Sequence, residues 1–414
     1  MASRANQMSI YNLRIIFLIA NFAYQLVPLW LMYSTGQGWP ILITIAFFFV
    51  FVPLFDMIYG DFPSLLGGKT SDRFFRALLM TQAILHFATF VSVIAVAASG
   101  AVPLWAGVLA AVVIGMVNVQ CPVVAHEFGH KTGRVNHQMS NFVCAVVGMG
   151  YFMPQHVLGH HVVVATPEDS ASAKFGEDAV SFIVGSFVAE VGGGIRLEAA
   201  RLRKRGLPVV SLRNDVLVSY GMSVVIAAAL VAWLGWIALP FILLHHYFAW
   251  FTLMLNDYLQ HYGLLREMLP NGRREPAGDQ HSWNTDTPLC NLLVFNVQRH
   301  SHHHAQPMLP YQALNDRPDA PRLPTGYFGM MLIALVPPLW FAIMDPRLVA
   351  VAGGRRERIN VGKRGLVRLE RLLRDYANGR DAAERLVIKE RDAAERPVIK
   401  ERDAAERLGD KLPA

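Results

Sequence analysis

Long apolar runs constrain the fold of this chain more than any other feature of its sequence. A helix rises about 1.5 Å per residue, so about 20 apolar residues are needed to cross the hydrocarbon layer of a membrane. Hydrophobic residues make up 53% of the 414-residue chain and charged residues only 17%, which is unusually apolar for a soluble domain. Six runs approach the required length, at residues 14–33, 40–59, 77–97, 103–124, 216–236 and 239–256. We therefore expect an all-α, integral-membrane bundle of six transmembrane helices.

A further apolar stretch, residues 326–344, contains Pro337 and Pro338. Proline removes a backbone donor and clashes with the preceding helical turn, so it interrupts a helix. We expect this stretch to form a re-entrant or interfacial helix rather than another span.

The connections between the predicted spans differ in their content of basic residues. Lys69, Arg73, Arg134 and Arg201 belong to basic connections on one side, whereas the opposite connections contain no lysine or arginine. Loops rich in these residues face the cytoplasm. The sequence therefore predicts a multi-pass protein of the cell inner membrane with both termini in the cytoplasm.

Charge is concentrated at the C-terminal end of the chain. The last 60 residues hold 17 of the 38 lysines and arginines, and a unit that begins RDAAER starts at Arg380, Arg391 and Arg402. We divide the chain into a membrane domain, residues 1–346, and a charged tail, residues 347–414. The tail is interpreted as a solvated appendage, with a docking arm as the alternative. No basic stripe interleaved with aromatic residues accompanies a soluble fold, so nucleic acid is not an expected partner.

Histidines gather directly after the fourth and sixth predicted spans. They form the clusters His126 and His130; His156, His160 and His161; His261; and His300, His302, His303 and His304. Two imidazoles spaced i, i+3 or i, i+4 share one helical face about 5–6 Å apart, close enough to bind one metal ion. The spacing pairs His126 with His130, His156 with His160, and His300 with His303 or His304. Their number exceeds the four ligands of a usual structural zinc site, so we expect more than one metal ion, and imidazole suits iron.

Other kinds of metal protein stay open at this point. The spacing of His126, Glu127 and His130 alone is that of an intramembrane zinc metallopeptidase, in which Glu127 would be the general base. That interpretation leaves the remaining clusters unexplained. A metal transporter would carry its ligands near the middle of the membrane rather than at helix ends.

The clusters resemble the histidine motifs of the integral-membrane alkane hydroxylases, a family related to the membrane fatty acid desaturases and to xylene monooxygenase. The family's motifs are H-E-x-x-H-K, E-H-x-x-G-H-H, N-Y-x-E-H-Y-G and L-Q-R-H-S-D-H-H-A. They match residues 126–131, 155–161, 257–263 and 297–305. Similar stretches outside these motifs extend the resemblance from about the second span to Pro346, so the tail is not covered.

The resemblance implies a non-haem di-iron centre with nine histidine ligands. These would be His126, His130, His156, His160, His161, His261, His300, His303 and His304. His302 stands where the family has aspartate, so we expect it to be a neighbour of the site. Gln155, Gln260 and Asp257 replace the family's Glu, Glu and Asn, which puts substrate range and redox tuning in doubt.

Outer acceptors normally orient ligand histidines and tune the metal. The candidates are Glu127, Asp257, Glu168 and Asp169, with His281 as a further supporting residue. Three histidines lie within predicted spans instead, and hydrogen-bonded structural roles are expected for them; they are His86, His245 and His246.

An unactivated alkyl C–H bond lies beyond the acid–base chemistry of side chains and requires a metal that activates dioxygen. The resemblance implies that the enzyme takes alkanes from the membrane lipid and hydroxylates their terminal methyl group to primary alcohols with O2. The sequence has no C-x-x-C pair, flavin fingerprint or haem attachment site, so the electrons must come from another protein. The resemblance implies rubredoxin, reduced by a flavoprotein rubredoxin reductase. A hydroxylase of methyl groups on aromatic rings, or a desaturase-like oxidase, is the alternative.

Overall fold

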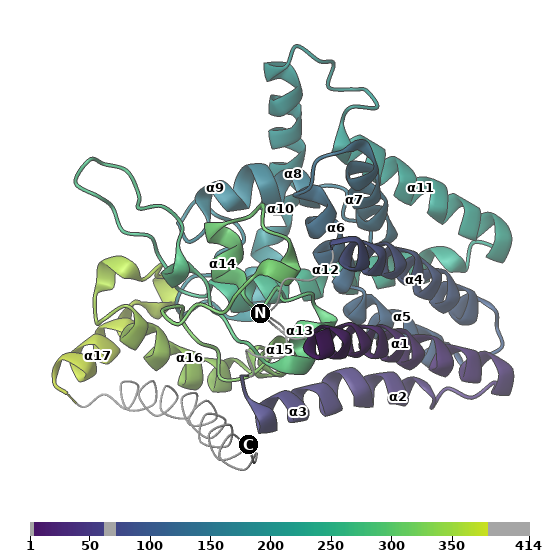
Figure 1. Cartoon of the computed structure of the whole chain (residues 1–414), viewed down its shortest axis with the longest axis horizontal. Coiled ribbons are helices and arrows are strands. Elements are labelled where there is room, and N and C mark those ends of the chain that lie inside the picture. The colour runs from purple at the N-terminus through teal and green to yellow at the C-terminus, as the bar shows by residue number, and fades with distance from the viewer. Residues whose placement is uncertain (1–3, 62–71, 380–414) are drawn as a thin grey trace, which may run out of the picture.

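The structure is a computed structural model that describes residues 4–61 and 72–379. Within these ranges it is all-α, as predicted, and isolated β-bridges join a few loop residues. Long helices form a bundle on one side of the molecule, and shorter helices and loops gather at its other end (Figure 1).

In residues 4–61 and 72–379, seven helices rather than the predicted six are long and apolar enough to cross a membrane. They are α1 (Arg4–Thr35), α2 to α3 (Ile41–Tyr59), α4 (Asp72–Ala98), α5 to α6 (Leu104–Gly129), α10 (Ala179–Lys204), α11 (Asp215–Leu234) and α12 (Ala238–His261). α10 was not predicted, because Glu190, Arg196 and Glu198 interrupt its apolar run. In Figure 1, α10 points in a different direction from α1, α4 and α5 and lies to one side of them.

Two of these spans combine several helical segments. Their bounds are α2 (Ile41–Ala46), the π-helical turn η1 (Phe47–Phe51), α3 (Val52–Tyr59), α5 (Leu104–Val117) and α6 (Gln120–Gly129). In the π-helical turn, Phe47 is buried and stacks on Tyr24 of α1, with ring centroids 3.9 Å apart. The turn therefore packs on its neighbouring helix.

Shorter helices build the end of the molecule beyond the bundle. They include α8 (Phe152–Gln155), the π-helical turn η3 (His156–His160), α9 (His161–Val163), α13 (Pro288–Leu293), α14 (His300–Ala305), α15 (Tyr327–Ala334), α16 (Pro337–Val351) and α17 (Leu366–Ala377). Another short helix, α7 (Arg134–Val146), packs instead on α6 and α11 of the bundle.

The apolar stretch with two prolines is broken where the sequence predicted an interruption. α15 and α16 meet at 118°, and Pro337 is the first residue of α16. A bend of this size belongs to a broken span or a re-entrant segment. α16 continues past residue 346, and the chain after it returns to the body, where Phe175 N donates to Asn360 O over 2.6 Å. The repeats that begin at Arg380 lie outside the described residues.

A polar link joins three transmembrane helices inside the bundle. His86 of α4 lies 3.0 Å from Asn118 Oδ1, and Asn118 Nδ2 lies 2.9 Å from His245 Nε2 of α12. His245 also contacts His246, with their Nδ1 atoms 3.2 Å apart. The prediction of hydrogen-bonded structural roles for these histidines is confirmed, since a buried imidazole is costly without a partner.

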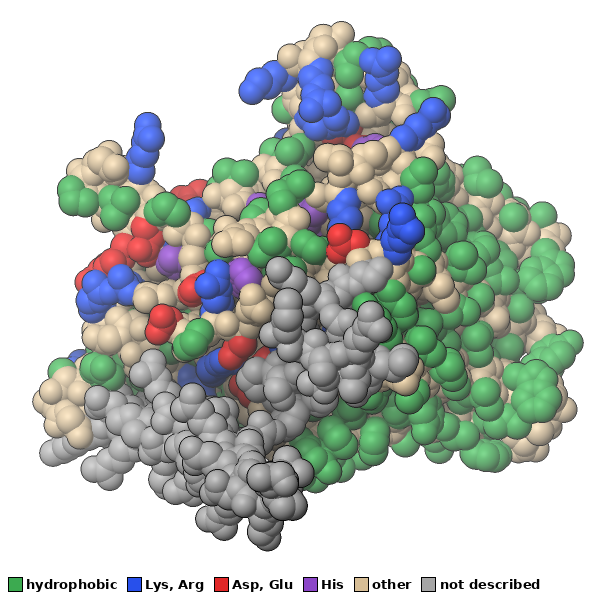
Figure 2. Space-filling model, viewed as in Figure 1, with side chains coloured by type: hydrophobic (Ala, Val, Ile, Leu, Met, Phe, Trp, Pro, Cys, Tyr) green, Lys and Arg blue, Asp and Glu red, His purple; other side chains and the backbone are tan. Residues whose placement is uncertain are grey.

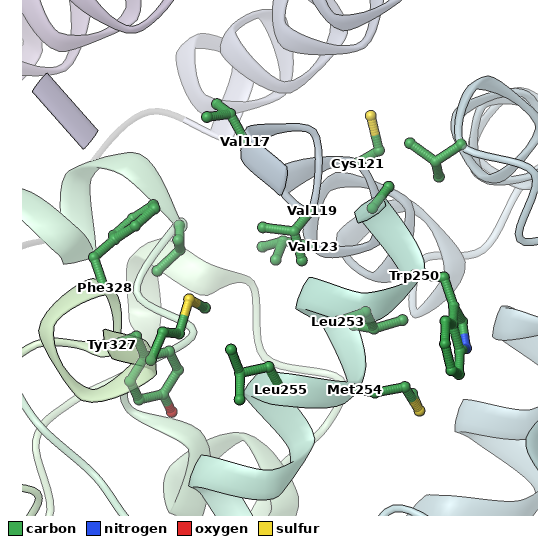
Figure 3. Close-up of a cluster of buried hydrophobic side chains, with 14 of the residues drawn as sticks. Val117, Val119, Cys121, Val123, Trp250, Leu253, Met254, Leu255, Tyr327 and Phe328 are labelled. Atoms are coloured by element: carbon green, nitrogen blue, oxygen red, sulfur yellow. The ribbon is translucent and has the colours of Figure 1, made fainter. Parts of the chain in front are cut away.

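Apolar and charged side chains divide the surface. Figure 2 shows hydrophobic side chains over the bundle and charged side chains with histidines over the remainder of the same face. Exposed apolar surface of this extent needs a lipid or protein cover, as expected of an integral membrane protein. Inside, a buried apolar layer includes Val123 of α6, Leu255 of α12 and Phe328 of α15 (Figure 3). It lies just before the points where α6 and α12 deliver their histidines.

Candidate metal centre

Four segments deliver the clustered histidines. α6 carries His126 and is followed at once by His130, and α12 ends at His261. The turn η3 supplies the second cluster and α14 the fourth. Histidines that lie more than 170 residues apart in the sequence thus come into contact, as His126 and His303 do.

The nine predicted histidines come together as two adjacent groups. The five-histidine group contains His126, His130, His156, His161 and His303, and the four-histidine group contains His160, His261, His300 and His304. Within each group, the possible ligand atoms all lie within 4.8 Å of one another. Every sequence-predicted ligand therefore lies in one group or the other.

The expected pairing of His156 with His160 is wrong, because the backbone there forms a π-helical turn. In such a turn the N–H of residue i+5 bonds to the carbonyl of residue i, and His161 N donates to His156 O. The two Nε2 atoms of His156 and His161 are 3.0 Å apart, whereas His160 faces the other group. In α14, likewise, His300 joins His304, and His303 belongs to the five-histidine group.

Nε2 atoms face one another in both groups. The distance is 2.8 Å between His126 and His303, and 3.1 Å between His303 and His161. In the four-histidine group, His300 Nε2 lies 3.0 Å from that of His304 and 3.2 Å from that of His261. Nitrogens held about 2.1 Å from one ion at right angles to each other would lie about 3 Å apart. The groups have the spacing of ligand sets.

The protonation of these imidazoles also fits a metal. Burial and neighbouring histidines hold the pKa values of His300, His303 and His304 well below the ordinary value. A neutral imidazole carries a free lone pair, which is the form that binds metals. His130 Nε2 is buried without a hydrogen-bond partner. A cation between the nitrogens would satisfy it, so the residues present fit a bound metal.

Outer acceptors are unevenly distributed. His160 Nδ1 contacts Asp169 Oδ2 over 3.0 Å, and Ser172 Oγ donates to the same oxygen over 2.6 Å. Burial alone would raise the pKa of Asp169, but these partners outweigh it and lower the pKa. His261 Nδ1 donates to the carbonyl of His281 over 3.1 Å. These contacts fix which nitrogen of His160 and His261 faces the centre.

The other predicted outer residues contribute less. His126 Nδ1 lies 3.6 Å from Glu127 Oε1, beyond ordinary hydrogen-bond length, and Glu127 Oε2 accepts from Tyr311 N over 3.1 Å. Glu168 is exposed. Asp257 lies close enough to interact electrostatically with His160.

His302 lies outside both groups, as expected. Its Nδ1 accepts a hydrogen bond from Asn315 N over 2.8 Å. The substituted Gln260 donates to Tyr327 Oη over 3.2 Å, so this side chain is occupied away from the histidines.

Two buried residues that support the centre, Arg299 and Glu190, were not predicted from the sequence. Arg299, directly before His300, pairs with Asp286 through Nε over 2.7 Å and Nη2 over 3.0 Å. Glu190 of α10 accepts hydrogen bonds beside the second histidine cluster. Arg299 lies in the quoted motif, which was a usable signal, whereas nothing in the sequence placed Glu190 there.

Comparison with known proteins agrees with this geometry. The model of the fatty acid desaturase family matches residues 103–343. The chain is 36% identical to alkane 1-monooxygenase 1 of Alcanivorax borkumensis, over 82% of this chain and 85% of that protein. It is 34% identical to alkane 1-monooxygenase of Pseudomonas putida, over 82% and 86%. The hydroxylase component of xylene/toluene monooxygenase of Pseudomonas putida is more distant, at 28% over 54% and 60%.

Proposed function

This chain belongs to the alkane 1-monooxygenase family within the fatty acid desaturase superfamily, and we propose that it is a non-haem di-iron enzyme that hydroxylates the terminal methyl group of alkanes. The observation that carries the proposal is the convergence of nine histidines in two adjacent groups. Two groups of four and five nitrogens suit two iron ions, since iron accepts imidazole ligands and leaves positions open for reaction.

Different histidines of the chain would hold the two ions. His160, His261, His300 and His304 would hold one ion, and the five-histidine group would hold the other. Two bound iron ions would supply the dioxygen activation that side chains cannot. The buried apolar layer of Figure 3 lies just before these ligands and would keep water from the reacting carbon.

Rubredoxin, reduced by its flavoprotein reductase, is the proposed electron donor. Hydroxylation consumes the hydrocarbon, O2, two electrons and two protons, and yields one alcohol and one water. The chain's three cysteines, Cys121, Cys144 and Cys290, are all buried and unpaired. A separate redox protein must therefore deliver the electrons.

The histidine layer is proposed to face the cytoplasm, with both termini on that side. His130 and His261 face one centre, so the chain between them must cross the membrane an even number of times. The hairpin of α11 and α12 supplies two crossings, and both ends of α10 are then expected on one side. Cysteines introduced at Asp178 and Gly206 should react equally with an impermeant reagent in inside-out vesicles. Reaction of only one of them would contradict this placement.

The activity is tested with membranes that contain the chain, rubredoxin, the reductase and reduced nicotinamide. We expect primary alcohols from n-alkanes of graded length, and about two iron atoms per purified chain. Omission of rubredoxin tests the donor separately from the chemistry. One zinc and no iron would favour the peptidase and contradict the proposal.

Hydroxylation of methyl groups on aromatic rings is the second candidate. It is favoured by the similarity to the xylene/toluene enzyme component. A methylated aromatic substrate in the same assay distinguishes the two: faster turnover of the aromatic than of any alkane would make this the main activity.

A further inference from the structure

We propose that Glu190 of α10 is a positioning residue that holds the two histidine groups in their relative placement. The inference rests on the metal centre of the proposed function, but it concerns a side chain that touches no ligand. Glu190 is 4% exposed and projects from α10, the helix that was not predicted.

The contacts of Glu190 reach the segments of both groups. Its Oε1 accepts from Gln155 Nε2 over 3.2 Å and from Ser170 Oγ over 2.5 Å. Gln155 directly precedes His156 of the five-histidine group. Ser170 directly follows Asp169, which orients His160 of the four-histidine group. One carboxylate thus links the residue before one ligand to the outer partner of another.

Gln155 and Ser170 also bond to each other, with Gln155 Nε2 donating to Ser170 Oγ over 3.2 Å. The three side chains therefore form a closed triangle in which Glu190 is the only acidic group. Buried networks of this kind rigidify their surroundings.

Glycines allow α10 to approach closely enough for this contact. A Cβ at Gly193 would lie 2.3 Å from Gln155 Oε1, and one at Gly194 would lie 2.5 Å from the carbonyl oxygen of Tyr151. Glycine is disfavoured within helices, so its presence here reflects the close packing of α10 on α8. α10 is thereby fixed on the segment that leads into His156.

The position of the carboxylate distinguishes this chain from the family motif quoted above. The motif has glutamate where this chain has Gln155, and Glu190 brings a carboxylate to the same place from another helix. In the exchange Q155E/E190Q, a carboxamide and a carboxylate would still face each other. Exchanging them should therefore preserve the triangle.

A double-mutant cycle tests this directly. The variants are Glu190→Gln, Gln155→Glu and the exchange Q155E/E190Q, all nearly isosteric with the natural pair. The readout is the chelator concentration at which half of the bound metal leaves the purified protein. Removing an outer partner typically costs about 10-fold to 100-fold in metal affinity or activity.

We expect Gln155→Glu to lower metal retention by more than about 10-fold, because two buried carboxylates then face each other. Glu190→Gln keeps acceptors for both donors, so its loss should be smaller. The exchange should bring retention back to within about threefold of the natural protein, since residues in one network are not additive. A purely structural role for α10 would instead give losses that add.

Glu198→Gln is the matched control. Glu198 is a buried carboxylate two turns further along α10, where it bonds to Arg201 and to Asp215 N. This variant should lower the melting temperature and leave metal retention unchanged. Equal metal loss in E198Q and E190Q, or an exchange no better than Q155E alone, would overturn the inference.

Different results would contradict the proposed function and the proposed role of Glu190. The iron count of the natural protein tests the function. The cycle is read with whichever divalent metal the chain retains, with Co2+ added if the purified protein is metal-free. Two iron atoms with additive losses would overturn the role of Glu190 alone, whereas rescue with a single zinc would overturn the di-iron proposal alone.

Discussion

The two histidine groups differ in how completely the protein encloses them. All four members of the four-histidine group are buried, and His160 and His261 have outer acceptors in Asp169 and the carbonyl of His281. In the five-histidine group, three members are only partly buried. Unpartnered Nδ1 atoms occur in both groups, at His126 and His303 in this one and at His300 and His304 in the other.

The same ligand type thus occupies two environments. Oriented, desolvated histidines give a rigid site, whereas loosely held and accessible ones can adjust and exchange. We infer that the four-histidine group is the permanent anchor of the centre. Its three partly buried histidines make the five-histidine group the more accessible of the two.

The largest effect is expected at His261 of the anchoring group. His261→Ala should abolish hydroxylation, a loss of more than about 100-fold, since even an outer partner is worth about 10-fold to 100-fold. His302→Ala is the matched control, because His302 lies in neither group and bonds to Asn315 N. Its activity should stay within about 10-fold of the natural protein. Equal loss of iron in both variants would show that the fourth cluster is wrongly assigned.

The second-largest effect is expected when metal is removed in steps, which should reveal the difference between the two groups. A graded chelator series should remove one ion first, from the five-histidine group, because its partly exposed ligands open more readily. Spectra of the half-depleted protein should then show one remaining iron with a single environment. Simultaneous loss of both ions at every chelator concentration would remove the distinction between anchor and open side.

A smaller effect on iron retention is expected from substitution of Asp169, and its sequence neighbour Glu168 provides the control. Asp169→Asn should lower iron retention by about 10-fold to 100-fold, because a neutral side chain no longer stabilises the orientation of His160. Glu168→Gln is the control, since Glu168 is exposed and should leave retention unchanged. Metal analysis after dialysis measures both. If E168Q lost as much iron as D169N, the contact with His160 would not be the cause.

The membrane class and the histidine clusters could be predicted because both depend on short sequence patterns. Apolar runs of fixed length are required by the hydrocarbon layer, and they correctly marked six of the seven helices. The histidines follow two of those helices closely, so their meeting in one layer was predictable. His302 could be set apart by the family motif and by its direction on a helix, which differs from the mean direction of its three neighbours.

The division of the histidines into groups could not be predicted from spacing. It depends on a π-helical turn at His156, which no simple spacing rule anticipates. The role of Glu190 could not be predicted for a related reason, because only the packing of α10 through Gly193 and Gly194 brings this side chain to the site. Local periodicity reports which face a residue occupies, but not which distant segment meets that face.

The smallest expected effect concerns a histidine outside both groups. His137 Nε2 lies 2.6 Å from Asp215 Oδ1, and this hydrogen bond raises the pKa of His137, although burial and Arg201 oppose the change. Whereas burial keeps the grouped histidines such as His300 neutral, His137 should therefore be charged in mildly acidic solution.

A raised folded-state pKa stabilises the protein fully below the unfolded value of about 6.5, and the stabilisation is lost as pH rises through the folded value. His137→Gln should thus lower the melting temperature at pH 6 and have little effect at pH 9. The side chain of His137 is 57% exposed, so the pair should contribute no more than about 1 kcal/mol. Iron content should stay unchanged at both pH values. A difference in melting temperature that does not shrink with rising pH would mean that His137 stabilises through packing, and the contrast between charged and neutral histidines would lose its support.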